Sequence, residues 1–261
     1  MKSTTITAAL LLLSSSMHAQ LATPNDKGVA MGHLHINTAD VAAQKKVWIG
    51  ILGATPMKLG NMEGAKMPGA VILFTAKAAT GPTEGSTVNH VGVVVPSIAS
   101  LPAKLDAEGI KYTKNANGKQ IMIDGPDGLK LEVTADPSVT DAVRFHHIHF
   151  YTGDPLAIQA WYFEKFGAKP GKRAQWEAGD IPGANLTYAK ATAEVAPTLG
   201  RALDHIGFEV RDLEVFCKNL EASGVKFEGP IHKAPQIGLQ YVFLVDPWGT
   251  RIELTEGLSH Q

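Results

Sequence analysis

Short stretches of alternating apolar and polar residues run through most of the chain, and glycine and proline separate them. Alternation with a period of two predicts half-buried strands. One such stretch, 205–210, is followed by a helical pattern at 213–223 that ends at Gly224, a residue suited to a helix C-terminus. The order of a strand, a helix and further strands then recurs along the chain. The pattern therefore predicts an α+β fold.

An internal repeat divides the sequence. The tetrapeptide His-Leu-His-Ile at 33–36 matches His-Ile-His-Phe at 147–150, and an aspartate and a Gly-Ala-x-Pro motif follow each at the same spacing. A second match joins 89–92 to 204–207 at nearly the same offset. Similarity at a fixed offset indicates repeated structural units. We therefore expect two similar domains, 29–137 and 143–257, each made of two halves that open with a histidine-bearing strand.

The first 19 residues have the pattern of an export signal. Lys2 precedes an apolar stretch at 8–13, small polar residues and Ala19, after which we expect cleavage. The apolar stretch is too short to span a bilayer, and no later run of about 18 uninterrupted apolar residues occurs. We therefore expect a periplasmic or secreted protein that has no membrane segment in its mature form.

The composition of the chain limits the kinds of binding partner that can be expected. With 44% hydrophobic residues the chain can form a globular core. Its 24 basic and 25 acidic residues nearly balance, so the net charge does not indicate electrostatic binding to nucleic acid. The single cysteine, Cys217, excludes an internal disulfide and lies in a helical stretch, where burial is more common than reactivity. A small-molecule substrate is the expected partner, and a homo-oligomer stays open.

Seven of the ten histidines lie on the strands that open the repeated units. Two imidazoles and one carboxylate from separate strands can hold a divalent cation and leave coordination positions open. We expect His147, His205 and Glu253 to form such a site, and the first domain to repeat it with His33, His90 and Glu132. The alternative is that these histidines are core residues, which is the commoner role of a single histidine on an apolar strand.

With these motifs the chain resembles the vicinal oxygen chelate superfamily, which includes glyoxalases, bleomycin resistance proteins, extradiol dioxygenases and epimerases. The resemblance covers nearly the whole chain after the leader. It implies paired βαβββ modules that form open, barrel-like sheets around a metal ion. It also implies the same six metal ligands, with the second-domain set favoured because the family's two-domain dioxygenases keep their metal there.

The resemblance also bears on the metal and the reaction. Glyoxalase-type members take a fourth ligand, usually Glu, from a strand where this chain has Asn185, or Leu73 in the first domain. Three protein ligands favour Fe²⁺ and oxygen chemistry, with Zn²⁺, Ni²⁺ or Mn²⁺ as alternatives.

The dioxygenase interpretation has a gap of its own. Ring-cleaving relatives carry a tyrosine where this chain has Phe243, so Tyr241 is the candidate on that strand, and His149 or His232 would have to move the proton. We take His149 and Tyr241 as candidate catalytic residues. A glyoxalase-like lyase or isomerase is the alternative, although export would separate it from cytosolic glutathione. A binding protein without catalysis is the third class.

Overall fold

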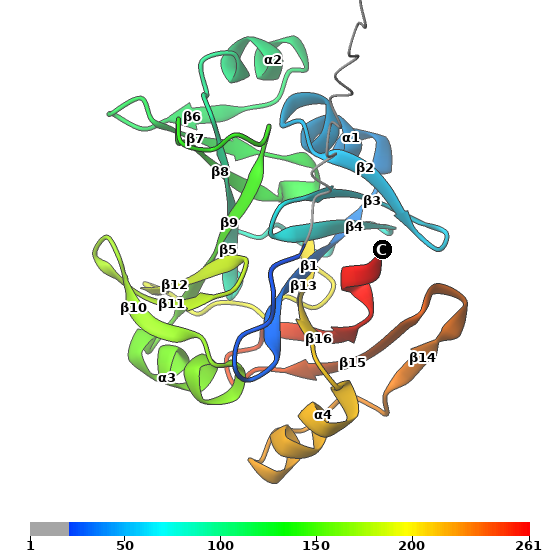
Figure 1. The fold of residues 1–261 in the computed structure, drawn as a ribbon. Helices are drawn as coiled ribbons and strands as arrows, with labels where there is room; N and C mark the ends of the chain where they lie inside the picture. The colour runs from blue at the N-terminus through cyan, green and yellow to red at the C-terminus, as the bar shows by residue number, and fades with distance from the viewer. Residues whose placement is uncertain (1–20) are drawn as a thin grey trace, which may run out of the picture.

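The structure is a computed structural model and describes residues 21–261, so the predicted export signal lies outside the described residues. Four units follow one another, each built from a strand, a helix and further strands, and we call them modules 1 to 4 (Figure 1). Module 1 contains β1 Val29–Thr38, α1 Val41–Lys45, β2 Thr55–Leu59, β3 Met62–Met67 and β4 Ala70–Ala76. Module 2 contains β5 Val88–Val95, α2 Leu101–Ala107, β6 Tyr112–Lys114, β7 Gln120–Asp124 and β8 Lys130–Ala135.

The second half of the chain repeats this order. Module 3 contains β9 Arg144–Thr152, α3 Pro155–Phe166, β10 Lys169–Arg173, β11 Trp176–Ile181 and β12 Ala184–Lys190. Module 4 contains β13 Leu203–Val210, α4 Leu213–Ala222, β14 His232–Ala234, β15 Leu239–Val245 and β16 Arg251–Glu256. A π-helical segment, Lys46–Ile51, extends α1, and three single-turn helices lie at Pro126–Gly128, Pro235–Ile237 and Leu258–His260. Each module is thus a βαβββ unit, as expected.

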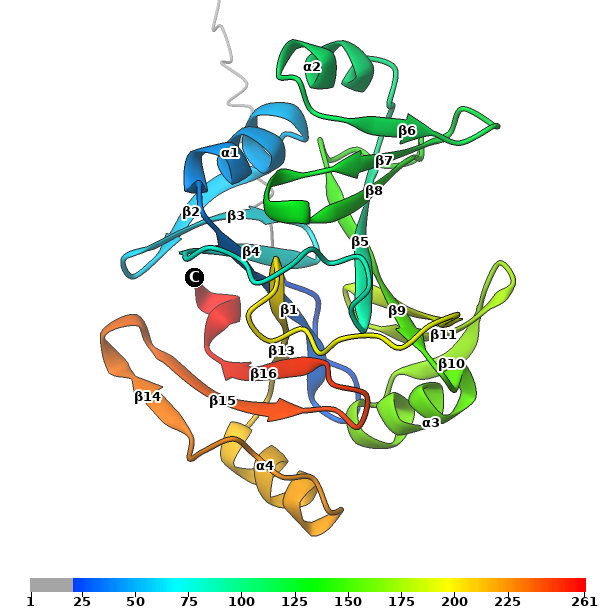
Figure 2. The same ribbon diagram turned by 180° about the vertical axis from the view of Figure 1, so that it is seen from behind.

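The modules join into two eight-stranded sheets. Sheet 1 has the order β14-β15-β16-β13-β1-β4-β3-β2, and sheet 2 has the order β10-β11-β12-β9-β5-β8-β7-β6. Figure 2 shows the consequence, because the blue start and the red end of the chain lie in the same sheet. Sheet 1 therefore combines modules 1 and 4, and sheet 2 combines modules 2 and 3. The predicted α+β class with paired modules is confirmed.

The pairing of the modules differs from the order of the sequence repeats. The repeats 29–137 and 143–257 suggest that consecutive modules pair, yet each sheet takes one module from each repeat. The opening strands form the central antiparallel pairs, β1 with β13 and β5 with β9. The linker at 136–143 keeps modules 2 and 3 in one sheet, whereas the segments 77–87 and 191–202 carry the chain from one sheet to the other.

The aspartates that mark the repeat are helix N-caps. Asp40 accepts a hydrogen bond from the backbone of Ala43 at 3.1 Å, and Asp154 accepts one from Ala157 at 3.0 Å. Such a bond satisfies a backbone N–H that has no partner in the first helical turn. At the other end of α3, Gly167 adopts a φ of 70°, a left-handed conformation that favours glycine. The repeated motifs therefore fix where the helices begin and end.

The two sheets share one hydrophobic core. Tyr162 on α3 is fully buried and packs against Tyr188 of sheet 2, with ring centroids 5.9 Å apart, and against Phe208 of sheet 1, at 6.4 Å. Its hydroxyl donates to Asp246 at 2.9 Å. Cys217 is also buried, as expected. Within residues 21–261, no helix combines the length and the apolar character that crossing a bilayer would require.

Candidate metal centres

The six predicted metal ligands lie in two separate groups, one on each sheet. The first cluster, on sheet 1, consists of His33, His35, His205 and Glu253. The second cluster, on sheet 2, consists of His90, His147 and His149, with Glu132 beside them. The expected triad of His147, His205 and Glu253 is therefore wrong as a single site. The reason is the exchange of modules, which places β9 in sheet 2 and both β13 and β16 in sheet 1.

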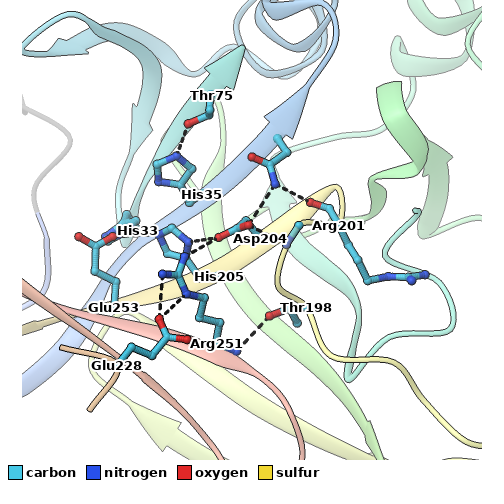
Figure 3. A network of polar contacts seen from close by, with 12 residues as sticks. His33, His35, Thr75, Thr198, Arg201, Asp204, His205, Glu228, Arg251 and Glu253 are labelled. Atoms are coloured by element: carbon cyan, nitrogen blue, oxygen red, sulfur yellow. Dashed lines mark hydrogen bonds and ion pairs between the residues drawn. The ribbon is translucent and has the colours of Figure 1, made fainter. Parts of the chain in front are cut away.

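A row of cross-strand neighbours builds the first cluster. His33 on β1 lies opposite Gly207 on β13, and Gly207 lies beside Glu253 on β16. Nε2 of His33 and Nε2 of His205 are each 2.9 Å from the same carboxylate oxygen, Oε2 of Glu253. All three side chains are buried. Figure 3 shows them converging from three neighbouring strands.

The imidazole of His33 lies directly over the backbone of Gly207. A Cβ atom at position 207 would lie 2.1 Å from Cε1 and Nδ1 of that ring, far closer than non-bonded atoms approach. Gly92 has the same role in sheet 2, where a Cβ would lie 1.9 Å from Cε1 of His147. In both sheets a glycine two residues after a histidine therefore makes room for the histidine of the adjacent strand.

A buried carboxylate orients His205. Oδ1 of Asp204 lies 2.6 Å from Nδ1 of His205, so Nδ1 donates to it and Nε2 faces Glu253. A carboxylate behind a histidine is the usual arrangement around metal-binding imidazoles, because it fixes the tautomer and raises the basicity of the ligand. Asp204 is held in turn by Asn37, by the backbone of Gly200 and by Arg251.

Electrostatics in the first cluster favour a negatively charged carboxylate. Burial opposes ionisation of Glu253, but His33 and His205 outweigh it and hold its pKa well below the ordinary value. Burial also lowers the pKa of His205, but its hydrogen bonds to Asp204 and Glu253 outweigh that effect and raise the pKa overall. Burial, together with His205 and His33, lowers the pKa of His35 to about 3. The cluster therefore presents an ionised carboxylate among imidazoles.

Arg251 borders the first cluster without binding its carboxylate. It donates to Asp204 at 3.1 Å and to Glu228 at 2.9 Å. Its guanidinium lies 3.9 Å from the centre of the Phe243 ring, and that ring contacts His205 edge-on at 5.2 Å. The carboxylate of Glu253 therefore contacts His33 and His205, whereas Arg251 binds Asp204 and Glu228.

These residues fit a divalent cation. The ligand atoms of His33, His35, His205 and Glu253 all lie within 4.8 Å of one another, the spacing expected around one ion. Two imidazoles with one carboxylate suit Fe²⁺, Zn²⁺, Ni²⁺ or Mn²⁺. His35, which offers a third imidazole and so a fourth ligand atom, also contacts Thr75, with Nε2 at 2.6 Å from Oγ1.

The strand register shows where a carboxylate would lie if it served as a fourth metal ligand. In module 4, Glu253 lies beside Gly207, the residue two after His205. In module 1 the residue two after His33 is His35, and its neighbour on β4 is Leu73, as expected. In sheet 2 the neighbour of His149 is Thr187, whereas Asn185 lies beside His147. The assignment of Asn185 to this place is therefore wrong by two residues, and neither sheet has a carboxylate there.

The second cluster differs in its carboxylate. Arg173 and Gln120 each donate to Oε1 of Glu132 at 3.0 Å. Glu132 stands farther from the histidines than Glu253 does, at 3.5 Å from Nε2 of His90 and 3.9 Å from Nε2 of His147. Burial opposes ionisation of Glu132, but His90, His147 and Arg173 hold its pKa far below the ordinary value. An internal cation therefore already compensates this carboxylate.

The histidines of the second cluster are buried and lack partners on the atoms that converge. Nε2 of His90, Nε2 of His147 and both ring nitrogens of His149 have no hydrogen-bond partner among the described residues. Burial and Arg173 lower the pKa of His147 well below its ordinary value, and burial, His90 and Arg173 lower that of His149 to about 3. Burial and nearby positive charge therefore both favour the neutral form of His147 and His149.

A cavity of about 710 Å³ opens beside the second cluster. Its wall includes His90, Asn89, Tyr151, Met122 and Lys130. Tyr151 also packs against His149, with ring centroids 5.4 Å apart. The volume is in the range of small-molecule sites.

The two candidate catalytic residues lie on different sheets. His149 belongs to the second cluster. Tyr241 lies on β15 of sheet 1, stacked on His232 at 5.1 Å and 5.8 Å from Phe243. His149 therefore cannot serve a site built on His205 and Glu253, where His35 takes the corresponding position of the repeat.

Several residues that shape these clusters escaped the sequence interpretation. Gly207 and Gly92 were visible as part of a repeated His-x-Gly motif, and Asp204 directly precedes His205, so a signal existed for each. Arg173 had none, because its contact with Glu132 joins two modules across sheet 2.

Comparisons with known proteins agree with this geometry. Residues 144–254 match the family model of the Glyoxalase/Bleomycin resistance protein/Dioxygenase superfamily. Glyoxalase I from Zea mays has a similar structure, with a TM-score of 0.67 and 14% identity over 89% of this chain and 94% of that one. A candidate dioxygenase from Bacillus subtilis has a TM-score of 0.65 and 16% identity over 93% of this chain and 88% of that one.

No curated protein sequence matches the chain. At 14–16% identity the structural likenesses show the fold, which in both cases extends over nearly the whole chain. Paired βαβββ modules, a histidine on each opening strand and a glutamate on a closing strand recur in both sheets. The family match over residues 144–254 and the fold of the described residues thus agree with the vicinal oxygen chelate superfamily of glyoxalases, bleomycin resistance proteins and dioxygenases.

Proposed function

We propose that this protein is an exported, divalent-metal enzyme that acts on a small substrate with vicinal oxygens, and that its reaction is of the dioxygenase type. One observation carries the proposal: Nε2 of His33 and Nε2 of His205 are both 2.9 Å from Oε2 of the buried Glu253. Two buried imidazoles that converge on one ionised carboxylate from separate strands form a donor set that suits a divalent cation. A cation held by all three side chains would keep open coordination positions for a substrate.

The first cluster is the better candidate for the catalytic metal. Its carboxylate is bound by histidines alone, whereas Arg173 already binds Glu132 in the second cluster. Leu73 leaves the site without a second carboxylate, which favours Fe²⁺ and open coordination positions. A bound metal supplies Lewis acidity toward the two substrate oxygens and stabilises the negative charge that develops on them.

Residues around the first cluster would orient its histidine ligands and the substrate. Asp204 holds His205 in the tautomer that presents Nε2, and Arg251 holds Asp204. The ring of Phe243 packs between Arg251 and His205 and excludes water from that side. Tyr241 and His232 form a stacked pair beside Phe243, where the aromatic faces suit a planar substrate.

A lyase or isomerase of the glyoxalase type is the second candidate. It is favoured by the imidazole of His35, which would give the first cluster four protein ligands. Lyase sites of this kind hold Zn²⁺ or Ni²⁺ and consume no oxygen. The fold similarity to glyoxalase I from Zea mays is compatible with either reaction, since it shows the fold alone.

Oxygen uptake tests the proposal. The mature chain is purified without air or chelator, its metal is measured, and oxygen consumption is followed with a panel of catechols, enediols and α-hydroxyketones. We expect iron in the first cluster and oxygen uptake that Glu253→Gln abolishes, while the exposed variant Glu214→Gln retains it. Isomerisation of an α-oxoaldehyde adduct without oxygen uptake would support the lyase. Ligand-dependent thermal stabilisation with no product would indicate a binding protein.

A further inference from the structure

We infer that the turn formed by residues 257–261 limits the size of the substrate at the first cluster. Leu258 sets the limit, and Glu209 is the residue that positions the turn. The inference rests on the proposed function, because it takes the first cluster as the catalytic site. It deepens that function by naming the substrate class, which is small compounds with vicinal oxygens and no bulky apolar substituent.

The turn lies inside the open barrel of sheet 1. After β16 the chain bends at Gly257, which has a φ of 105°, and forms the single helical turn Leu258–His260. Figures 1 and 2 both show this red segment between β4 and β15. In the strand order of sheet 1, β16, β13 and β1 lie between those two strands. The sheet therefore curves around the turn.

Leu258 connects the two arms of the curved sheet. It is 2% exposed and belongs to an apolar cluster whose other buried members are Leu59 of β2, Val71 and Leu73 of β4, and Leu239 of β15. Strands β2 and β15 are not neighbours in the sheet, so the curvature brings their side chains to the same apolar cluster. Leu258 thus fills space that the two arms enclose.

The apolar cluster borders the first cluster on two sides. Leu73 is the neighbour of His35 on β4. On the other arm Tyr241 packs against the apolar cluster, and its ring lies 5.8 Å from Phe243, which contacts His205. A substrate that binds the first cluster and stacks on Tyr241 would therefore lie against this apolar wall.

Glu209 holds the turn in place. Its carboxylate is buried and accepts hydrogen bonds from the backbone of Gly257 at 3.0 Å, of Leu258 at 3.3 Å and of Ser259 at 3.1 Å, and from the hydroxyl of Thr255 at 2.8 Å. All four donors are neutral, and three belong to the turn. Moving the turn would leave a buried carboxylate without most of its donors, which is costly. The turn is therefore a fixed wall.

The strand register places this anchor next to the first cluster. Glu253 lies beside Gly207, and Thr255 lies beside Glu209, two residues further along both strands. Alternate residues of a strand point to the same face, and two residues span about 7 Å. Glu209 and the turn are therefore on the face that carries the first cluster. A large substituent that extends along β13 would meet Leu258.

Sheet 2 does not repeat this arrangement. Val94 and Thr134 occupy the register positions that Glu209 and Thr255 hold in sheet 1. A valine side chain accepts no hydrogen bond, so it cannot anchor a turn in this way. After β8 the chain continues through 136–143 to β9. The anchored turn is therefore a feature of the sheet in which we place catalysis.

The test compares two probes, catechol and tert-butylcatechol, by calorimetry on the Zn²⁺-loaded chain, where no turnover occurs. The binding that Glu253→Gln abolishes is assigned to the first cluster. We expect the wild type to bind catechol at least about tenfold more tightly than tert-butylcatechol. In Leu258→Ala the two affinities should come within about threefold, because the lost side chain leaves room. Leu156→Ala, at a residue 63% exposed on α3, is the control and should keep the preference.

Glu209→Gln tests the positioning role. Glutamine keeps the size of the side chain, but its amide group presents N–H donors to the N–H groups of the turn. We expect the ratio of the two affinities to approach that of Leu258→Ala, with unchanged metal content. A lower melting temperature with the wild-type ratio would show that Glu209 contributes to stability alone, and would overturn its positioning role.

A dye separates failure of this inference from failure of the proposed function. If neither catechol binds the Zn²⁺-loaded wild type, the proposed function fails, and the fluorescence of anilinonaphthalene sulfonate then decides the inference. Deleting residues 258–261 should expose the apolar cluster and raise that fluorescence at least about fivefold, without loss of circular dichroism. The inference is overturned if the wild type binds both catechols equally, if Leu258→Ala and Leu156→Ala give the same ratio, or if the deletion leaves the fluorescence unchanged.

Discussion

The ring of His33 occupies the space in which a side chain at Gly207 would lie, at 2.1 Å from an added Cβ atom. The same relationship joins His147 to Gly92 in sheet 2. A histidine pressed flat against a glycine cannot rotate toward its own strand, so its Nε2 is held toward the glutamate on the far side of the glycine. The glycine is thus part of the ligand geometry although it binds nothing.

The first prediction follows from this contact. Gly207→Ala forces the ring of His33 away from Glu253, and we expect metal affinity at the first cluster to fall roughly tenfold or more, with a loss of stability of about 1–3 kcal/mol from overpacking. Metal content after dialysis and thermal unfolding measure the two effects. Gly171→Ala is the control, because an added Cβ there has no neighbour within 4 Å. Full metal retention in Gly207→Ala would show that His33 is not a ligand.

The second prediction concerns Asp204. Asp204→Asn keeps an oxygen that accepts from Nδ1 of His205 but removes the negative charge of the carboxylate. His205 would then have a neutral amide acceptor, as His90 has in Asn89. We expect metal affinity to fall about 10- to 100-fold, as is usual when a ligand's hydrogen-bond partner is altered. Competition with a chelator measures it. Unchanged affinity would mean that Asp204 serves only the packing with Arg251.

The third prediction uses Cys217. Burial is the main cause that raises the pKa of its thiol to about 11, and Glu221 adds to it. At pH 8 the thiolate fraction is then about a hundredfold below that of a thiol at the ordinary value, and the thiolate is the reactive species. We expect negligible labelling by a thiol reagent in the native protein, a rise with pH toward 11, and one labelled thiol per chain in denaturant. Fast native labelling at pH 8 would contradict this.

The fourth prediction concerns the core that the sheets share. Tyr162→Phe removes the hydrogen bond to Asp246 and leaves a buried carboxylate with one donor fewer. We expect the free energy of unfolding to fall by about 1–3 kcal/mol in urea titrations, without loss of bound metal. Tyr112→Phe is the control, because its hydroxyl makes only a long, exposed contact of 3.5 Å with Asp106, and it should change stability by less than about 0.5 kcal/mol.

Sequence and structure agree wherever the signal is local or repeated. The alternation along 205–210 and the glycine at 224 locate β13 and the end of α4, and the repeated histidines and glutamates identify six of the eight residues that form the two clusters. The grouping of those six could not be read from the sequence. It depends on which strand becomes the neighbour of β1, and the spacing between His33 and His90 or between His33 and His205 carries no information about that choice.

The charge balance of each cluster also could not be predicted from the sequence. Glu132 and Glu253 occupy equivalent positions in the repeat, yet one is bound by an arginine from the β10–β11 hairpin and the other is not. A contact of this kind arises only when modules 2 and 3 come together. The sequence therefore predicts the candidate ligands, whereas the tertiary structure determines which other side chains contact each carboxylate.

The joining of modules 1 and 4 has a consequence for the synthesis of the protein. His33 and Glu253 are 220 positions apart, so the first cluster cannot assemble until β16 has been synthesised. Sheet 2 can form earlier from modules that are consecutive in the chain, while β1 pairs with β4 but lacks β13 on its other edge. A chain that stops before β16 would keep sheet 2 and its three imidazoles but lack the carboxylate of sheet 1. The first cluster is thus completed only in molecules that include β16.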